Sequence, residues 1–159
     1  MNTDTPHGDN LDPATAALAA LAAAHRSLSA VIDRELRAAC GLSLAEADVL
    51  ASIAHSPDGR QRMADIAGLV SVSKSGVTQI TDRLVAAGLA ARESSATDRR
   101  LVYAAITTAG RELLDKFAPV LAAIAREHIA SRLPDTDLCK LTQALRAIAS
   151  TSPPEASQR

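Results

Sequence analysis

Residues with hydroxyl, amide and basic side chains cluster between positions 73 and 110 of the 159-residue sequence. The segment 73–88 carries them at the polar positions of a helical pattern, and a loop that follows contains Arg99 and Arg100. Hydroxyl and amide groups hydrogen-bond to base edges, whereas lysine and arginine bind phosphates. A helix with such a face, followed by a hairpin with a basic tip, has the shape needed to bind a DNA groove and the neighbouring phosphates.

The first part of this stretch is predicted to be a helix with one buried and one exposed face. Ser73 can cap the free N–H groups of the first turn, and Gly88 can take the left-handed conformation that ends a helix. Val77, Ile80 and Leu84 recur at the helical period and must face inward. The outward positions are then Lys74, Ser75, Thr78, Gln79 and Arg83. The alternative interpretation is an ordinary amphipathic helix whose polar face is simply solvated.

Two short segments, 89–93 and 101–106, follow the helix and are predicted to pair as antiparallel strands, the second of them with the β-branched residues Val102 and Ile106. The polar loop between them closes a hairpin. In that loop Asp98 precedes Arg99 and Arg100, and its carboxylate can hydrogen-bond locally and hold a guanidinium in place. A tip ordered in this way reaches a minor groove at a lower entropic cost. The alternative is an exposed loop whose charges are incidental.

The chain resembles the MarR (multiple antibiotic resistance regulator) family of transcriptional regulators in two motifs. They are the helix-turn-helix segment IAGLVSVSKSGVTQITDRLVAAGLAAR (66–92) and the wing segment DRRLVYAAITTAG (98–110). The resemblance extends from about position 18 to position 148. It implies a winged helix-turn-helix that binds pseudo-palindromic DNA as a homodimer, with the fourth helix in the major groove and the wing in the minor groove.

The resemblance also implies which residues contact DNA. On the fourth helix these are Ser73, Lys74, Ser75, Thr78, Gln79 and Arg83, and at the wing tip they are Asp98, Arg99 and Arg100. Gly76 departs from the family pattern, because relatives often carry a side chain there, and a glycine loosens the first turn of the helix. The implied function is that of a repressor, released when a small-molecule effector changes the spacing of the two DNA-binding regions.

Composition favours a helical protein with a basic region. The sequence is 47% hydrophobic but only 1% aromatic, so its core is built from Ala, Leu, Ile and Val, which suits closely packed helices. The net charge is -1, yet the region 60–111 has eight basic and four acidic residues and carries +4, which leaves -5 for the remainder. Phosphate binding depends on local charge, so a basic DNA-binding region on an acidic body is expected.

Helical periodicity also organises the first part of the chain. Apolar residues recur over 14–36 and predict one long helix that ends at Gly41. Ser43 and Glu46 form the capping box of a second helix, which ends in the turn 56–59. The next expected elements are a brief strand at 61–63 and a short helix at 64–69.

The last third of the sequence supplies apolar helix faces that one small domain cannot cover. A long helix is predicted at 108–132, with a bend or irregularity at Pro119, and Pro134 separates it from a final helix that reaches position 148. Pairing with the same helices of a second copy would bury these faces and set two fourth helices about one DNA turn apart. A monomeric helical bundle is the alternative.

The predicted fold class is mainly α with a small β-hairpin wing, in which a winged helix-turn-helix is joined to a helical dimerisation region. The predicted parts are a disordered tail at 1–10, a dimerisation region at 11–41 and 108–150, a DNA-binding domain at 42–107 and a second disordered tail at 151–159. Terminal segments without apolar periodicity have no face to pack.

His25, Asp33 and Arg37 on the first helix are the candidate effector-binding residues. The resemblance implies that family members often bind small aromatic or phenolic acids near the junction of the dimerisation and DNA-binding regions. The alternative is a solvated helix face, which carries such residues routinely. A rival trigger is redox sensing by Cys40, if Arg37 stabilises its thiolate, although a lone buried cysteine is usually an inert small hydrophobe.

No cofactor, metal site or catalytic site is expected. Cys40 and Cys139 lie far apart and outside any CxxC pattern, and the histidines show no ligand spacing. No phosphate-binding loop, carboxylate pair or nucleophile motif appears, which argues against an enzyme. No apolar run approaches a membrane span and the N-terminus lacks a signal-peptide pattern, so a cytoplasmic protein is predicted. A winged-helix protein-interaction module that does not bind DNA is the remaining alternative.

Overall fold

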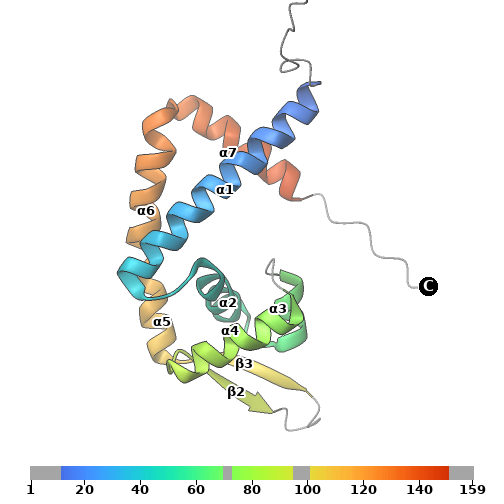
Figure 1. Ribbon diagram of the computed structural model, residues 1–159, viewed down its shortest axis with the longest axis vertical. Helices are drawn as coiled ribbons and strands as arrows, with labels where there is room; N and C mark the ends of the chain where they lie inside the picture. The colour runs from blue at the N-terminus through green and yellow to red at the C-terminus, as the bar shows by residue number, and fades with distance from the viewer. Residues whose placement is uncertain (1–11, 70–72, 95–100, 151–159) are drawn as a thin grey trace, which may run out of the picture. The chain divides into compact units, whose positions relative to one another are not determined.

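The computed structural model describes residues 12–69, 73–94 and 101–150 (Figure 1). In chain order its elements are α1 (Pro13–Cys40), α2 (Leu44–His55), β1 (Arg60–Arg62), α3 (Met63–Leu69), α4 (Lys74–Ala86), β2 (Ala90–Ser94), β3 (Val102–Ile106), α5 (Thr108–Asp115), α6 (Phe117–His128), the short 3-10 helix η1 (Ala130–Arg132) and α7 (Asp135–Ala149). The predicted fold class, mainly α with a small antiparallel sheet, is confirmed. The predicted tails at 1–10 and 151–159 lie outside the described residues.

Two compact units make up the chain, and we call them the N-terminal unit (Met1–Val120) and the C-terminal unit (Leu121–Arg159). The N-terminal unit contains α1 to α5 and the sheet, whereas the C-terminal unit contains the last part of α6, η1 and α7. The predicted division into a DNA-binding domain at 42–107 and a dimerisation region at 11–41 and 108–150 stays a prediction.

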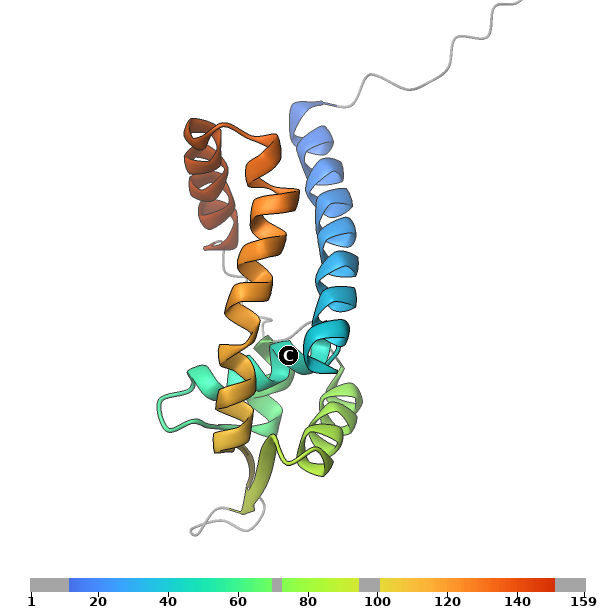
Figure 2. The same cartoon turned by 90° about the vertical axis from the view of Figure 1, so that its left-hand side faces the viewer.

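α1 is one uninterrupted helix (Figure 2). The Asp12 carboxylate caps its start by accepting hydrogen bonds from the N–H groups of Ala14 at 3.0 Å and Thr15 at 3.2 Å. Gly41, with a φ of 74°, ends the helix in the left-handed conformation, as predicted. Leu36 is its one buried residue within the described part of the chain, so most of the helix surface has no cover within this unit.

The expectation that no apolar run approaches a membrane span needs correction. By length and composition alone, α1 is long and apolar enough to cross a bilayer. Arg26 is the only charged residue between positions 13 and 31, and the many alanines outweigh the few polar side chains in that stretch. Length and composition are a weak criterion, because apolar helices that pack against other protein surfaces satisfy it as well.

α2 supplies the centre of the core. Its predicted capping box is confirmed, because the Ser43 hydroxyl accepts from the N–H of Glu46 at 3.2 Å and the Glu46 carboxylate accepts from the N–H of Ser43 at 2.8 Å. Val49, Leu50 and Ile53 are completely buried. They belong to one hydrophobic cluster with Leu36, Ile66, Val77, Ile80, Leu84, Ala90 and Ala104. α2 therefore joins α1, the helix-turn-helix and the sheet.

The strands form an antiparallel sheet in the order β1-β3-β2. β2 pairs with β3 from Ala90 opposite Ile106 to Ser94 opposite Val102, which confirms the predicted hairpin. Both strands begin one residue later than predicted. β1, predicted as a brief strand at 61–63 without a partner being named, pairs along the other edge of β3 and makes the sheet three-stranded.

The long helix predicted at 108–132 is divided into α5, α6 and η1. Pro119 has no N–H for the carbonyl of Asp115, four residues earlier, and α5 ends at Asp115. The predicted irregularity at Pro119 is therefore confirmed, and it lies one turn before the proline rather than at the proline itself.

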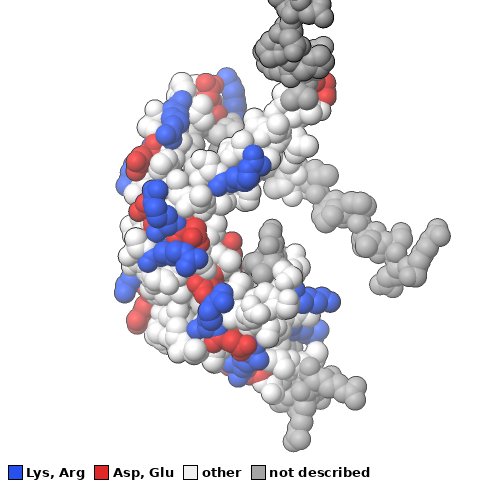
Figure 3. All heavy atoms as spheres, viewed as in Figure 1, with Lys and Arg blue, Asp and Glu red and all other residues white. Residues whose placement is uncertain are grey.

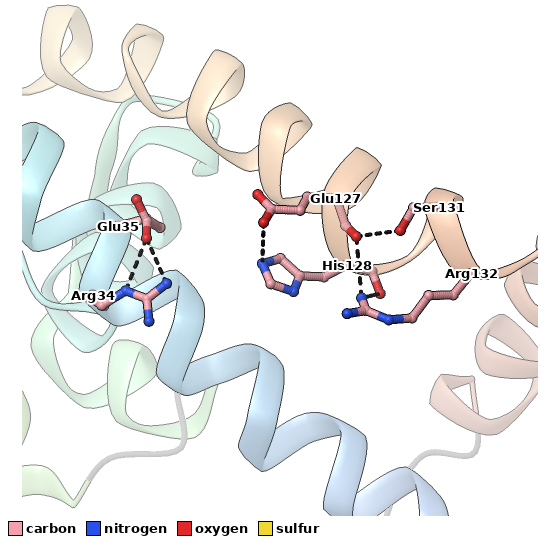
Figure 4. A network of polar contacts seen from close by, with 6 residues as sticks. All are labelled: Arg34, Glu35, Glu127, His128, Ser131 and Arg132. Atoms are coloured by element: carbon pink, nitrogen blue, oxygen red, sulfur yellow. Dashed lines mark hydrogen bonds and ion pairs between the residues drawn. The ribbon is translucent and has the colours of Figure 1, made fainter.

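Side-chain capping closes the end of α6. The Arg132 guanidinium donates to the backbone carbonyls of His128 at 2.5 Å and Glu127 at 3.3 Å, and the Ser131 hydroxyl also donates to the Glu127 carbonyl (Figure 4). Such bonds satisfy carbonyls that have no partner within the helix. Pro134 then precedes α7, as predicted.

Gly110, at the start of α5, tests how tightly the sheet and α5 pack. A Cβ atom at this position would lie 2.2 Å from the Leu89 carbonyl oxygen and 2.9 Å from Cγ1 of Ile106, so Gly110→Ala should destabilise the protein by about 2 kcal/mol or more in urea unfolding. Gly68→Ala on α3 is the matched control, because a Cβ there meets no described atom within 4 Å. The control should be neutral or slightly stabilising. Equal effects of the two substitutions would contradict this packing.

Candidate DNA-binding surface

α4 presents two faces of opposite character. Val77, Ile80 and Leu84 are buried, as predicted, and Thr81 is also fully buried. Among the described residues the Thr81 hydroxyl has no hydrogen-bond partner. The polar side chain of threonine gave no reason to predict that Thr81 would be buried. The opposite side is exposed, and we call it the α4 outer face. It consists of Lys74, Ser75, Thr78 and Gln79.

Hydrogen bonds shape the first turns of this helix. The Ser73 hydroxyl accepts from the N–H of Gly76 at 3.2 Å and lies 3.1 Å from the Ser75 hydroxyl, which confirms Ser73 as the N-cap. The Thr78 hydroxyl donates to the Lys74 carbonyl at 3.2 Å. Within the described part of the chain, the side chains of Lys74 and Gln79 take part in no hydrogen bond or ion pair. The long polar side chains of the α4 outer face thus point to solvent with their donors available.

Arg83, the sixth predicted residue of α4, is held by another helix. Its Nε donates to Oε1 of Glu46 on α2 at 2.7 Å, and the side chains of Arg83 and Glu46 are 58% and 12% exposed. Burial disfavours the charged carboxylate, but hydrogen bonds from Ser43 and Arg83 outweigh this effect and keep the pKa of Glu46 below its ordinary value. Glu46 therefore both completes the capping box of α2 and holds Arg83 of α4, and we call the contact between Glu46 and Arg83 the Glu46 anchor.

Asp33 joins α1 to the start of α2. One carboxylate oxygen accepts from the N–H of Leu44 at 2.8 Å and the other from Nε of Arg37 at 2.7 Å. The hydrogen bond from Arg37, followed by that from Leu44, lowers the pKa of Asp33. Two of the three candidate effector-binding residues are thus paired with each other. His25 is exposed and lies eight residues earlier on α1, about 12 Å along the helix axis, so the structure does not bring it to this pair.

The base of the wing carries arginines on both faces of the sheet. Arg92 on β2 pairs with Asp82 on α4 at 2.8 Å. On the other face, Arg60 and Arg62 of β1 lie 5.2 and 6.0 Å from the centre of the Tyr103 ring. This second group was not among the predicted site residues, although alternation in Arg-Gln-Arg puts two arginines on one face of a strand.

The remaining predicted positions are the wing tip and Cys40. Asp98, Arg99 and Arg100 at the wing tip lie outside the described residues. Cys40 is half-buried beside the core, and its proposed partner Arg37 is paired with Asp33.

Over the N-terminal unit, Figure 3 shows basic and acidic side chains interleaved on the visible face rather than one continuous basic patch. Specific placement of donors, more than bulk charge, distinguishes α4.

The fold and this surface define a winged helix-turn-helix protein, and comparisons with known proteins identify its family. The sequence profile of the MarR family matches residues 41–101. The transcriptional regulator MhqR of Bacillus subtilis is 30% identical over 128 residues, which are 80% of this chain and 86% of MhqR. YkoM, another regulator of that bacterium, is 32% identical over 77 residues, and this chain spans only half of its length.

Among solved structures, the fold is similar to that of Sco3205, a MarR family transcriptional regulator from Streptomyces coelicolor in complex with DNA. The TM-score is 0.78 at 25% identity, and the match covers 96% of this chain and 97% of Sco3205. The chain belongs to the MarR family of transcriptional regulators. Members of this family are DNA-binding regulators and not enzymes.

The Glu46 anchor makes a pH-dependent contribution to stability. Because the pKa of Glu46 is lowered in the folded state, its ionised form stabilises the protein above the ordinary value of 4.5, and this contribution disappears as the pH falls through the lowered pKa. Glu46→Gln should therefore lower the free energy of unfolding by about 1 kcal/mol at pH 7 and by much less at pH 3.5. Urea unfolding at both pH values measures this difference, and a deficit independent of pH would contradict the anchor.

Proposed function

We propose that this protein represses transcription by binding a pseudo-palindromic operator as a homodimer, with α4 in the major groove and the wing in the minor groove. The observation that carries the proposal is the α4 outer face, which is exposed along its length while the opposite side of the helix is buried. A major groove admits a helix of this kind, and lysine and glutamine donors read guanine and adenine edges or bind phosphates.

The proposed DNA contacts comprise Ser73, Lys74, Ser75, Thr78, Gln79 and Arg83 on α4 and Asp98, Arg99 and Arg100 at the wing tip. The helix residues differ in the contacts they can make. The hydroxyls lie close to the helix and suit short contacts, whereas Lys74 and Gln79 extend further and have free donors. We therefore assign base discrimination to Gln79 and phosphate binding to Lys74.

Uncovered apolar surface supports a dimer. In the N-terminal unit, Leu18 of α1 is 68% exposed. In the C-terminal unit, the exposed large apolar residues are Leu121, Leu141, Leu145 and Ile148. Large apolar side chains at regular positions on helices are seldom left in water, and a second copy of the chain would cover them. We accordingly assign 11–41 and 108–150 to dimerisation and 42–107 to DNA binding.

Release is proposed to follow binding of a small aromatic or phenolic acid near the start of α2. The carboxylate of such a ligand would compete with Asp33 for Arg37, and Asp33 also caps α2 through Leu44. Loss of that bond would alter how α1 meets the DNA-binding domain. His25 would take part only if it lines the same site from further along α1. The alternative trigger for release from DNA is oxidation of the Cys40 thiol. Binding of an operator implies that the protein is cytoplasmic.

Fluorescence anisotropy with a duplex from the DNA flanking its own gene tests the DNA contacts. Lys74→Ala should weaken binding about threefold to tenfold and reduce the slope of log affinity against log salt by about 2, because the dimer loses one phosphate contact in each copy. Gln79→Ala should instead reduce discrimination between the operator and unrelated DNA by about 1–3 kcal/mol.

Lys140→Ala on α7 is the matched control, because it removes one exposed lysine far along the chain from α4. The control should change neither the affinity nor the salt slope, and sedimentation should show every variant as a dimer. If Lys74→Ala behaves like Lys140→Ala, or if no duplex is bound, the proposed function is wrong.

A further inference from the structure

Arg83 differs from the residues of the α4 outer face in the way its side chain is held. Within the described part of the chain, polar contacts of Ser75 and Thr78 stay within α4 or its N-cap, whereas Arg83 bonds to a residue 37 positions earlier on α2. An arginine in such a bond is not a freely mobile surface cation. The partner, Glu46, therefore decides where the guanidinium lies.

Glu46 is itself fixed on two sides. Its Oε2 accepts from the N–H of Ser43 at 2.8 Å and from the Ser43 hydroxyl at 2.7 Å, and its Oε1 accepts from Arg83 at 2.7 Å. The side chain is only 12% exposed. Because the capping box fixes the carboxylate against α2, Glu46 offers Arg83 an acceptor at a set position rather than a flexible counterion.

The bond to Glu46 uses only Nε of the guanidinium. No hydrogen bond or ion pair of the two terminal nitrogens is found within the described residues, and the Arg83 side chain is 58% exposed. Since the group is planar, a bond through Nε also fixes the plane in which the terminal N–H groups lie. Two parallel N–H groups held in a known plane are suited to bidentate binding of a phosphate.

We propose that Glu46 is a positioning residue for DNA binding, which orients Arg83 so that its terminal nitrogens bind a backbone phosphate of the operator. The inference rests on the proposed function and adds to it a residue that touches no DNA. Holding the guanidinium in place before binding lowers the entropic cost of ordering a long side chain in the complex. It also fixes the position of α4 along the groove, because a phosphate contact sets register.

The sign of one substitution separates this role from simple electrostatics. Glu46→Gln removes a negative charge near the DNA-binding surface, so charge alone predicts tighter binding. Glutamine can still serve as the third residue of a capping box, because its oxygen can accept from the N–H of Ser43. Its amide group would then face Arg83 and could not replace Oε1 as an acceptor. A positioning role therefore predicts weaker binding.

The test is a double-mutant cycle in DNA affinity, measured by anisotropy on the full chain with the DNA that flanks its gene. Glu46→Gln should weaken binding about threefold to tenfold, and Arg83→Gln at least as much. The double variant should bind no more weakly than Arg83→Gln, within about twofold, because Glu46 acts through Arg83. Arg83→Lys keeps the charge but loses the planar group, and should also weaken binding.

The matched control is Glu35→Gln on α1, which removes the same charge from an exposed pair with Arg34 and should leave affinity unchanged. Thermal melting of each variant confirms that the fold is intact. Unchanged or tighter binding by Glu46→Gln would overturn the positioning role, as would an equal loss in the Arg83→Gln background. A wild-type chain that binds no duplex would instead overturn the proposed function, and this inference with it.

Discussion

Burial of the apolar side of α4 is the constraint on which the rest of the candidate DNA-binding surface depends. Val77, Ile80 and Leu84 are at most 4% exposed, and they share a core with Val49 and Leu50 of α2. Successive helical residues are about 100° apart, so once these positions face inward, the α4 outer face must face water. Loss of this packing would let α4 rotate and would scramble every contact assigned to it.

Local signals accounted for most of the element boundaries. These signals act through a residue's own backbone or through residues three or four positions away, so the sequence is enough to place the helix ends that they define. They are Gly41, the Ser43–Glu46 capping box, Ser73 and Pro119. β1 is different, because its pairing with β3 joins segments about 40 residues apart and only the tertiary fold creates it.

The same distinction applies to the candidate site. Helical periodicity placed Lys74, Ser75, Thr78 and Gln79 on the exposed side of α4, and the structure agrees. Periodicity could not show that Arg83 bonds to Glu46, because that contact depends on how α2 and α4 pack. The resemblance to the family grouped His25 with Asp33 and Arg37 on the same helix, although about two turns separate it from Asp33 and more than three from Arg37. Spacing along the chain defines faces, whereas contacts between elements define sites.

Two carboxylates at the start of α2 connect the proposed regulatory and DNA-binding regions, Asp33 through a hydrogen bond and Glu46 through an ion pair. Asp33 binds the first turn of α2 from α1, and Glu46 binds α4 from the same turn. In a two-copy regulator, small changes where the first helix meets this turn would alter the distance between the two DNA-binding helices. The short N-terminal turn of α2 is thus the structural connection between effector binding and DNA binding in the proposed mechanism.

The most direct measurement is an NMR titration of the ¹⁵N-labelled full-length protein with a duplex from the DNA flanking its own gene. Binding through α4 predicts that shifted backbone and side-chain N–H signals concentrate in residues 73–83, with the Gln79 amide and Arg83 Nε–H among them, while signals of α7 stay in place. Shifts that avoid residues 73–83 at saturating duplex would contradict the assignment of α4 as the DNA-binding helix.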